Sequence, residues 1–81
     1  MQIRFEMLGV LQRLAGEDSV SVEAGDDITV AGALDLLALA RPELRSELSR
    51  CAVAQGENLM RRRDFVVPGA TLALLPPVAG G

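Results

Sequence analysis

The sequence contains no histidine, lysine, tryptophan or tyrosine, and Cys51 is its single cysteine. Without histidine, the usual general base near neutral pH is missing. A cysteine with no histidine partner is a poor nucleophile, and we expect Cys51 to be a buried apolar residue. One cysteine excludes an internal disulfide, and a zinc site would need more sulfur or imidazole ligands. We therefore expect no acid–base, nucleophilic or metal chemistry from the chain's own side chains.

Further absences narrow the classes of partner. Aromatic residues make up 2% of the chain and the formal net charge is −3, so no basic surface for nucleic acid is expected. There is no phosphate-binding glycine motif, so we expect no bound cofactor. No apolar run is long enough to cross a membrane. The first residues lack a basic region followed by an apolar stretch, so we expect no signal peptide, no membrane partner and a cytoplasmic location.

What the chain does have is an unusual end, Leu75-Pro76-Pro77-Val78-Ala79-Gly80-Gly81. A carboxylate preceded by two glycines has no side chain beside it and can enter a narrow channel. Glycine loses more conformational freedom than any other residue when it is ordered, so packing alone would not favour it here. Frayed termini are common, but this end follows an apolar strand and a diproline that favours an extended course. We therefore expect a body over residues 1–75 and a flexible tail over residues 76–81.

Hydrophobic periodicity predicts the elements of the body. Residues 2–8 and 19–24 alternate as strands with one buried face, and residues 9–16 suit one or two helical turns closed by Gly16. Residues 29–40 form the main helix with Thr29 as N-cap, and Leu36 and Leu39 widen its apolar stripe enough to be covered as well. Pro42 ends it. The remaining elements expected in the body are a short helical turn over 43–49 and strands at 51–55, 59–60 and 71–75.

This order predicts an α+β domain, because one helix can cover a hairpin and a returning strand. The first and last strands would be parallel neighbours at the centre of a mixed sheet of about four to five strands, with the main helix on one face. This is the β-grasp arrangement of ubiquitin. If Leu72 and Leu74 face the helix, Leu75 faces away, near Leu8 on the first strand. Two apolar side chains at the root of the tail favour a docking surface.

The last eight residues, Leu74 to Gly81, resemble the C-terminal signature of the small subunit of molybdopterin synthase, a ubiquitin-like sulfur carrier. In that family an apolar pair precedes Pro-Pro-Val, a small residue and Gly-Gly. Length, element order and the segment GVLQRLAG after the first strand resemble it as well. The chain departs from the family in having Ala70 after Gly69 and Ala54 after Val53, where aspartate and asparagine are common.

The resemblance implies a role for the chain's end. An ATP-dependent activating enzyme would adenylate the carboxylate of Gly81, and a sulfur donor protein would supply sulfur for a thiocarboxylate. The large catalytic subunit of molybdopterin synthase would then accept the tail, and sulfur would pass to a cyclic pyranopterin monophosphate. The chain would be the sulfur-donating subunit, no enzyme by itself, with ATP used only by the activating enzyme. Gly80 would fit a narrow tunnel, and the partner would contact Leu8, Leu75, Pro76, Pro77, Val78 and Ala79.

Three other interpretations stay open. Sulfur carriers for thiamine or cysteine biosynthesis share the body and the Gly-Gly end. A ubiquitin-like modifier would be conjugated through Gly81 to lysines of other proteins, although a chain without lysine cannot form lysine-linked chains of itself. An interaction module would only dock its tail. The run Arg61–Arg63 is either a solvated turn or a patch that steers the chain toward an acidic partner.

Overall fold

The computed structural model describes residues 1–69 and 71–77. Over this part of the chain the strands are β1 (Gln2–Met7), β2 (Ser19–Glu23), β3 (Ala52–Gln55), β4 (Asn58–Met60) and β5 (Thr71–Leu75). The helices are α1 (Val10–Ala15), α2 (Val30–Ala40) and α3 (Arg45–Leu48), and a 3₁₀ turn over Pro42–Leu44 leads into α3.

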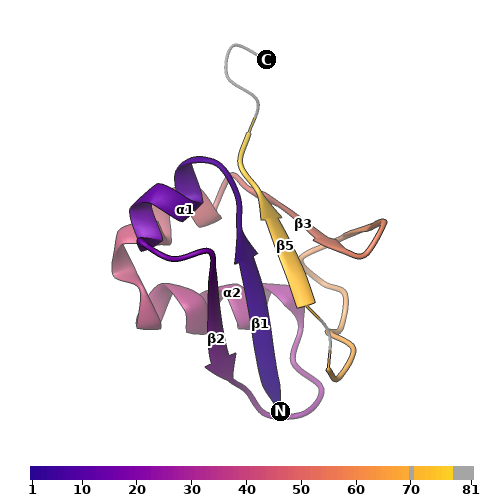
Figure 1. The fold of residues 1–81 in the computed structure, drawn as a ribbon. Coiled ribbons are helices and arrows are strands. Elements are labelled where there is room, and N and C mark those ends of the chain that lie inside the picture. The colour runs from indigo at the N-terminus through magenta and orange to yellow at the C-terminus, as the bar shows by residue number, and fades with distance from the viewer. Residues whose placement is uncertain (70, 78–81) are drawn as a thin grey trace.

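The strands form one mixed sheet in the order β2-β1-β5-β3-β4. Strand β1 pairs antiparallel with β2 and parallel with β5, and β5 pairs antiparallel with β3. Helix α2 lies across one face of the sheet, and the chain continues upward from the end of β5 in Figure 1. The expected α+β architecture, with the first and last strands side by side at the centre and one main helix on one face, is confirmed.

The core lies between the sheet and the helices. The inward residues of β1 are Ile3, Phe5 and Met7, and each is almost fully buried. They meet the inward side chains of β5 and α2, namely Leu72, Leu74, Val30, Ala33, Leu34 and Leu37. Burying a side chain of this size contributes about 1.5–3 kcal/mol to folding. The alternation that predicts the strands is therefore also what builds the core.

Helix α2 begins at Val30 because every donor of its first turn has an acceptor. The Thr29 side chain accepts a bond from the N–H of Gly32, at 3.2 Å. The N–H of Val30 donates to the carbonyl of Asp64 and that of Ala31 to the carbonyl of Arg62, at 2.8 and 2.9 Å. Without acceptors these N–H groups would stay unpaired. The loop between β4 and β5 therefore closes the start of the main helix.

The other helix ends follow their local sequence. Gly16 closes α1 in the left-handed conformation (φ 73°), as predicted. Helix α2 ends at Ala40, two residues before Pro42. One expectation is wrong: Leu39 is 71% exposed, because the helix has only one face against the sheet and Leu39 lies at its outer margin. No helix within the described residues is long and apolar enough to cross a membrane.

Candidate functional site: the root of the C-terminal tail

The parallel pair of β1 and β5 sets the geometry where the chain leaves the body. The last pair in register is Met7 with Leu74, and both side chains point into the core. Leu75 is the next residue of β5, and Leu8 directly follows the end of β1, so continued alternation turns both toward the opposite face. Leu8 is 39% exposed and Leu75 is half-buried. The structure thus places both leucines at the end of the central strands, on the side away from α2.

The residues that follow Leu8 and Leu75, namely Gly9 and Pro76, also lie close to each other. A Cβ atom added to Gly9 would be 3.1 Å from Cγ of Pro76. Pro76 is half-buried and Pro77 is exposed. The β1–β5 alignment therefore continues to the first proline of the tail. The predicted site residues Val78, Ala79, Gly80 and Gly81 lie outside the described residues.

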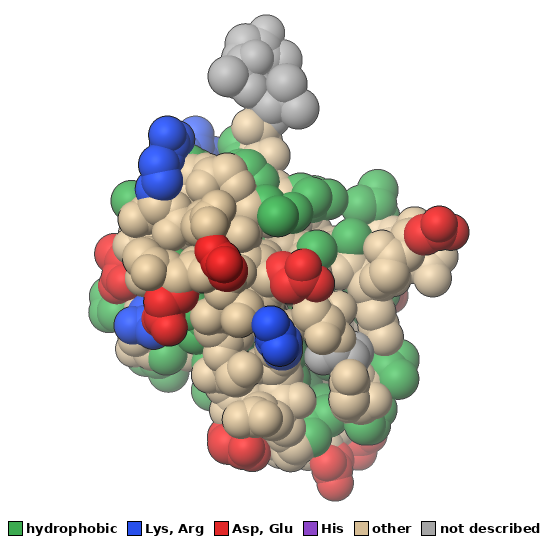
Figure 2. Space-filling view, in the orientation of Figure 1, with side chains coloured by type: hydrophobic (Ala, Val, Ile, Leu, Met, Phe, Trp, Pro, Cys, Tyr) green, Lys and Arg blue, Asp and Glu red, His purple; other side chains and the backbone are tan. Residues whose placement is uncertain are grey.

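The uncovered face of the sheet carries more apolar surface beside this point. The register aligns Ala73 with Ala54 and Ala54 with Leu59, and it pairs Leu75 with Ala52. Leu59 is 71% exposed. We call Leu8, Ala52, Leu59, Ala73 and Leu75 the tail-root patch. Figure 2, in the orientation of Figure 1, shows hydrophobic side chains gathered at the upper end of this face. An exposed apolar cluster at such a place is typical of a protein-binding surface.

The same face of the sheet also carries charged side chains beside the tail-root patch. Arg4 and Glu6 alternate along β1, and Glu6 is aligned with Ala73 on one side and Ser19 on the other. In Figure 2 acidic and basic side chains lie over the centre of this face, beside the hydrophobic group. A partner that covers the tail-root patch would therefore meet an apolar centre with a charged border. Interfaces commonly have this composition.

Sequence reasoning placed Leu8 and Leu75 on this face of the sheet but did not identify the apolar residues beside them. The contributions of Ala52 and Leu59 depend on the order of β5, β3 and β4 in the sheet, which alternation within one strand does not reveal. The contact of Gly9 with Pro76 depends on the β1–β5 register. The one available signal was the glycine directly after a strand, which often marks a close approach of two backbone segments.

Cys51 is buried, and its thiol donates to the carbonyl of Leu48 at 3.3 Å. Burial raises the pKa of this thiol above its ordinary value, against the smaller opposing effect of the Arg62 charge. A thiol with a raised pKa keeps its proton near neutral pH and is a weak nucleophile. Cys51 is therefore a buried residue, as the sequence predicts.

We expect the Cys51 thiol to react with iodoacetamide at pH 8 at least about a hundredfold more slowly in the native protein than in urea-unfolded chain. Because its pKa is raised on folding, the native state holds the proton more tightly, and this contribution to stability is lost as the pH rises above the pKa of the unfolded chain. Mass spectrometry of timed aliquots measures the ratio. Equal rates would contradict the burial.

The three arginines of the run Arg61–Arg63 differ in how exposed they are to solvent. Arg61 and Arg63 are exposed, whereas Arg62 is half-buried. The Arg62 guanidinium donates to the carbonyls of Leu48 and Cys51, at 3.1 and 2.6 Å, where α3 ends and the chain turns into β3. Its own carbonyl accepts from α2. Arg62 therefore holds α3 and the 61–66 loop together, a structural role that neither interpretation of the run included.

Replacing Arg62 with alanine is expected to lower the free energy of unfolding by about 1–3 kcal/mol, because two carbonyl groups lose a charged donor. Arg61→Ala and Arg63→Ala serve as matched controls, and their expected effects stay within about 0.5 kcal/mol. Urea titration followed by circular dichroism measures all three. An Arg62→Ala value as small as the controls would mean that these hydrogen bonds add nothing.

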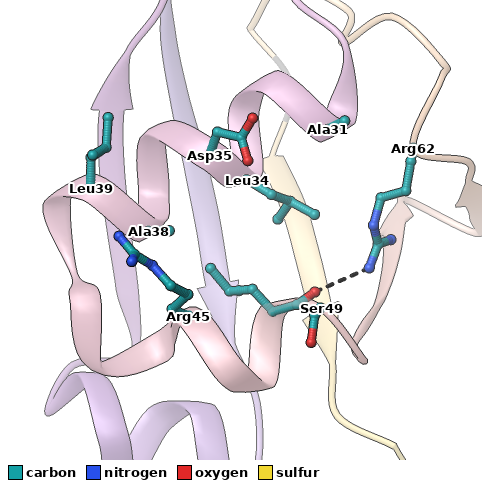
Figure 3. Close-up of a pocket in the computed structure, with 9 residues that line it drawn as sticks. Ala31, Leu34, Asp35, Ala38, Leu39, Arg45, Ser49 and Arg62 are labelled. Carbon is teal, nitrogen blue, oxygen red and sulfur yellow. Dashed lines mark hydrogen bonds between the residues drawn. The ribbon is translucent and has the colours of Figure 1, made fainter.

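A groove of about 500 Å³ lies between α2 and α3, on the helical side of the molecule. Figure 3 shows Asp35, Arg45 and Ser49 around it, with Arg62 turned to bond the α3 backbone. Within the described residues no buried side-chain polar atom lacks a partner, and no three acidic, cysteine or histidine side chains are grouped as a metal site requires.

Comparison with known families agrees with this geometry. A model described as the ThiS family matches residues 6–81. The chain belongs to the ThiS family. It is a small ubiquitin-like protein of the sulfur-carrier and modifier type. The match extends to the last residue, so it includes the tail.

Solved structures resemble this ThiS-family chain over nearly its whole length. SAMP1 of Haloferax volcanii is 29% identical with a TM-score of 0.89, and each chain covers 100% of the other. A chain of the BexX/CysO complex of Amycolatopsis orientalis is 25% identical with a TM-score of 0.73, covering 98% of this chain and 99% of that one. A chain from the complex of subunits 1 and 2 of the molybdopterin-converting factor of Helicobacter pylori 26695 is 24% identical over 100% of both chains, with a TM-score of 0.68. These similarities confirm the β-grasp fold.

Proposed function

We propose that this chain is a sulfur carrier whose working group is the carboxylate of Gly81. The observation that carries the proposal is the tail root: the two central strands end together beside Pro76, and an exposed apolar patch lies next to that point. Strands that end together beside an apolar patch would allow the body to dock on another protein and present its own end to it. Membership of the ThiS family supports the same role.

The chemistry requires a good leaving group at the end of the chain. The Gly81 carboxylate attacks the α-phosphorus of ATP on an activating enzyme, and pyrophosphate leaves. Hydrosulfide, supplied by a sulfur donor protein, then attacks the carbonyl carbon; the C–S bond forms, the C–O bond to AMP breaks, and AMP leaves. A thiocarboxylate results. Transfer of its sulfur to an acceptor, with water supplying oxygen, restores the carboxylate.

The acceptor we favour is a pyranopterin precursor, with the chain as the small subunit of molybdopterin synthase. The diproline before Val78 supports this choice over the carriers for thiamine and cysteine biosynthesis. The base and acid groups of the transfer would come from the large subunit, since this sequence has no histidine. The tail-root patch would bind that subunit, and the stiff prolines would limit the entropy lost when the tail inserts.

Intact mass spectrometry of the protein isolated from its native host tests the reaction class. We expect two species that differ by the exchange of one oxygen for one sulfur, with the change localised by fragmentation to Gly81. A matched chain that lacks Gly80 and Gly81 should show only the lighter species. A sulfur-free terminus under conditions of active cofactor synthesis would contradict the proposal.

Conjugation to other proteins is the second candidate. It is favoured by the 28% identity to a second structure of the Haloferax volcanii protein, described there as a small archaeal modifier protein. The same acyl adenylate would then be attacked by a lysine amine, which forms an amide bond and expels AMP. Immunoblots of host lysate separate the two candidates: bands of higher mass that resist thiol reagents indicate a modifier, and their absence beside a thiocarboxylate indicates a carrier.

A further inference from the structure

Gly9 stands where the first strand turns abruptly into α1. β1 ends at Met7 and α1 begins at Val10, so the chain reverses within two residues. Gly9 has φ 59° and ψ −129°, a backbone conformation that is strained for any L-residue with a side chain. Its carbonyl accepts from the N–H of Gln12 at 3.1 Å, which fixes the turn from the helix side. This glycine is held in place by its own turn.

The ring of Pro76 rests on this glycine. A Cβ on Gly9 would lie 3.1 Å from Cγ and 4.0 Å from Cδ of Pro76, so the ring would have to shift by a few tenths of an ångström to admit a side chain. The left-handed glycine at the other end of α1, Gly16, has nothing within 4 Å of the same position. The left-handed backbone conformation alone therefore explains the glycine at residue 16. At residue 9, glycine is required for a second reason as well, because Pro76 lies close by.

The ring is the part that would have to move. The last strand before it is held on both sides, because Leu74 pairs with Met7 in β1 and Leu75 pairs with Ala52 in β3. Proline has a fixed φ, so moving its ring also turns the bond that leads to Pro77. A side chain at residue 9 would therefore change the direction in which the chain leaves the body.

We propose that Gly9 is a positioning residue for the carrier terminus: by leaving room for the Pro76 ring it sets the direction in which the chain leaves the body at Pro76. This inference rests on the proposed function. A reactive group displaced by about 1 Å can lose as much as a hundredfold in rate, so the direction of a short tail matters to the enzyme that receives it.

A double-mutant cycle with Gly9→Ala and Pro76→Ala tests the contact. We expect Gly9→Ala to lower kcat/KM for ATP–pyrophosphate exchange on the activating enzyme by about tenfold or more. In the Pro76→Ala background, which lacks the ring, the same change should cause no further loss. If backbone strain alone were responsible, Gly9→Ala would cost the same in both backgrounds, and that result would overturn the proposal.

A D-alanine at residue 9 is the matched control. Its methyl group replaces the other Cα hydrogen and suits a positive φ, so it removes the strain and keeps the space for the ring. The chain can be assembled by chemical ligation at Cys51. We expect the D-alanine variant to match the parent in rate and thermal midpoint, and a D-alanine variant as slow as Gly9→Ala would contradict the contact as the cause.

A measurement on the free protein separates this inference from the proposed function. In the parent, NMR should show a nuclear Overhauser contact between the Cα protons of Gly9 and the ring protons of Pro76. If that contact is present and no activating enzyme accepts the parent, the proposed function fails and the geometry stands. If Gly9→Ala does not fold, Pro76→Ala alone decides: an unchanged exchange rate would overturn the inference.

Discussion

A chain extended by one alanine after Gly81 is expected to fold like the parent and to lose adenylation and sulfur transfer, with exchange rates lower by about a hundredfold or more. The extra residue moves the carboxylate by one peptide unit and adds a Cβ where the proposed channel admits none. The fold should be unaffected, because the buried core residues of the described part lie between Ile3 and Leu74. ATP–pyrophosphate exchange measures the first effect and a thermal melt the second.

Two controls make this result specific. A chain with a protease-removable extension should regain full exchange once it is cut back to Gly81, which excludes damage elsewhere. Gly81→Ala keeps the length and adds only a methyl group, so it separates the position of the carboxylate from the need for a bare α-carbon. An extended chain that supports cofactor synthesis while still uncleaved would rule out the terminus as the reactive group.

Much of this architecture was predictable because its determinants are local. The period-two alternation in β1 and β5 requires only that one face of each strand be buried, and both strands were predicted to within one residue. Thr29 and Gly16 act through backbone groups a few residues away, so their roles as helix caps can be derived from the sequence.

What could not be predicted depends on residues far apart in the chain. Arg62 bonds the end of α3, and its carbonyl accepts from α2; no pattern within 61–64 reveals either partner. The exposure of Leu39 follows from how much of α2 the sheet covers, which depends on the width and twist of the sheet. The same limit applies to Gly9, whose neighbour Pro76 is near the opposite end of the sequence.

Leu74→Ala is expected to lower the free energy of unfolding by about 2–5 kcal/mol, because it leaves a cavity at a fully buried position on the central strand. A small domain has only about 5–15 kcal/mol in total, so the variant should be partly unfolded at 37 °C. Its neighbour Leu75 is the matched control, since it has the same side chain on the opposite face of β5. Leu75→Ala should cost about 1 kcal/mol or less. Urea titrations of both variants give the difference.

The same pair separates folding from docking. If the tail-root patch binds the partner, Leu75→Ala should weaken the complex by about tenfold, or about 1.4 kcal/mol, while the free protein stays folded. Leu74→Ala, measured at a temperature where it is still folded, should bind as the parent does, because Leu74 faces the core. Calorimetric titration against the large subunit of molybdopterin synthase measures both. Equal affinity for Leu75→Ala and the parent would exclude Leu75 from the interface, and the tail beyond it would then have to supply the binding energy that we assign to the patch.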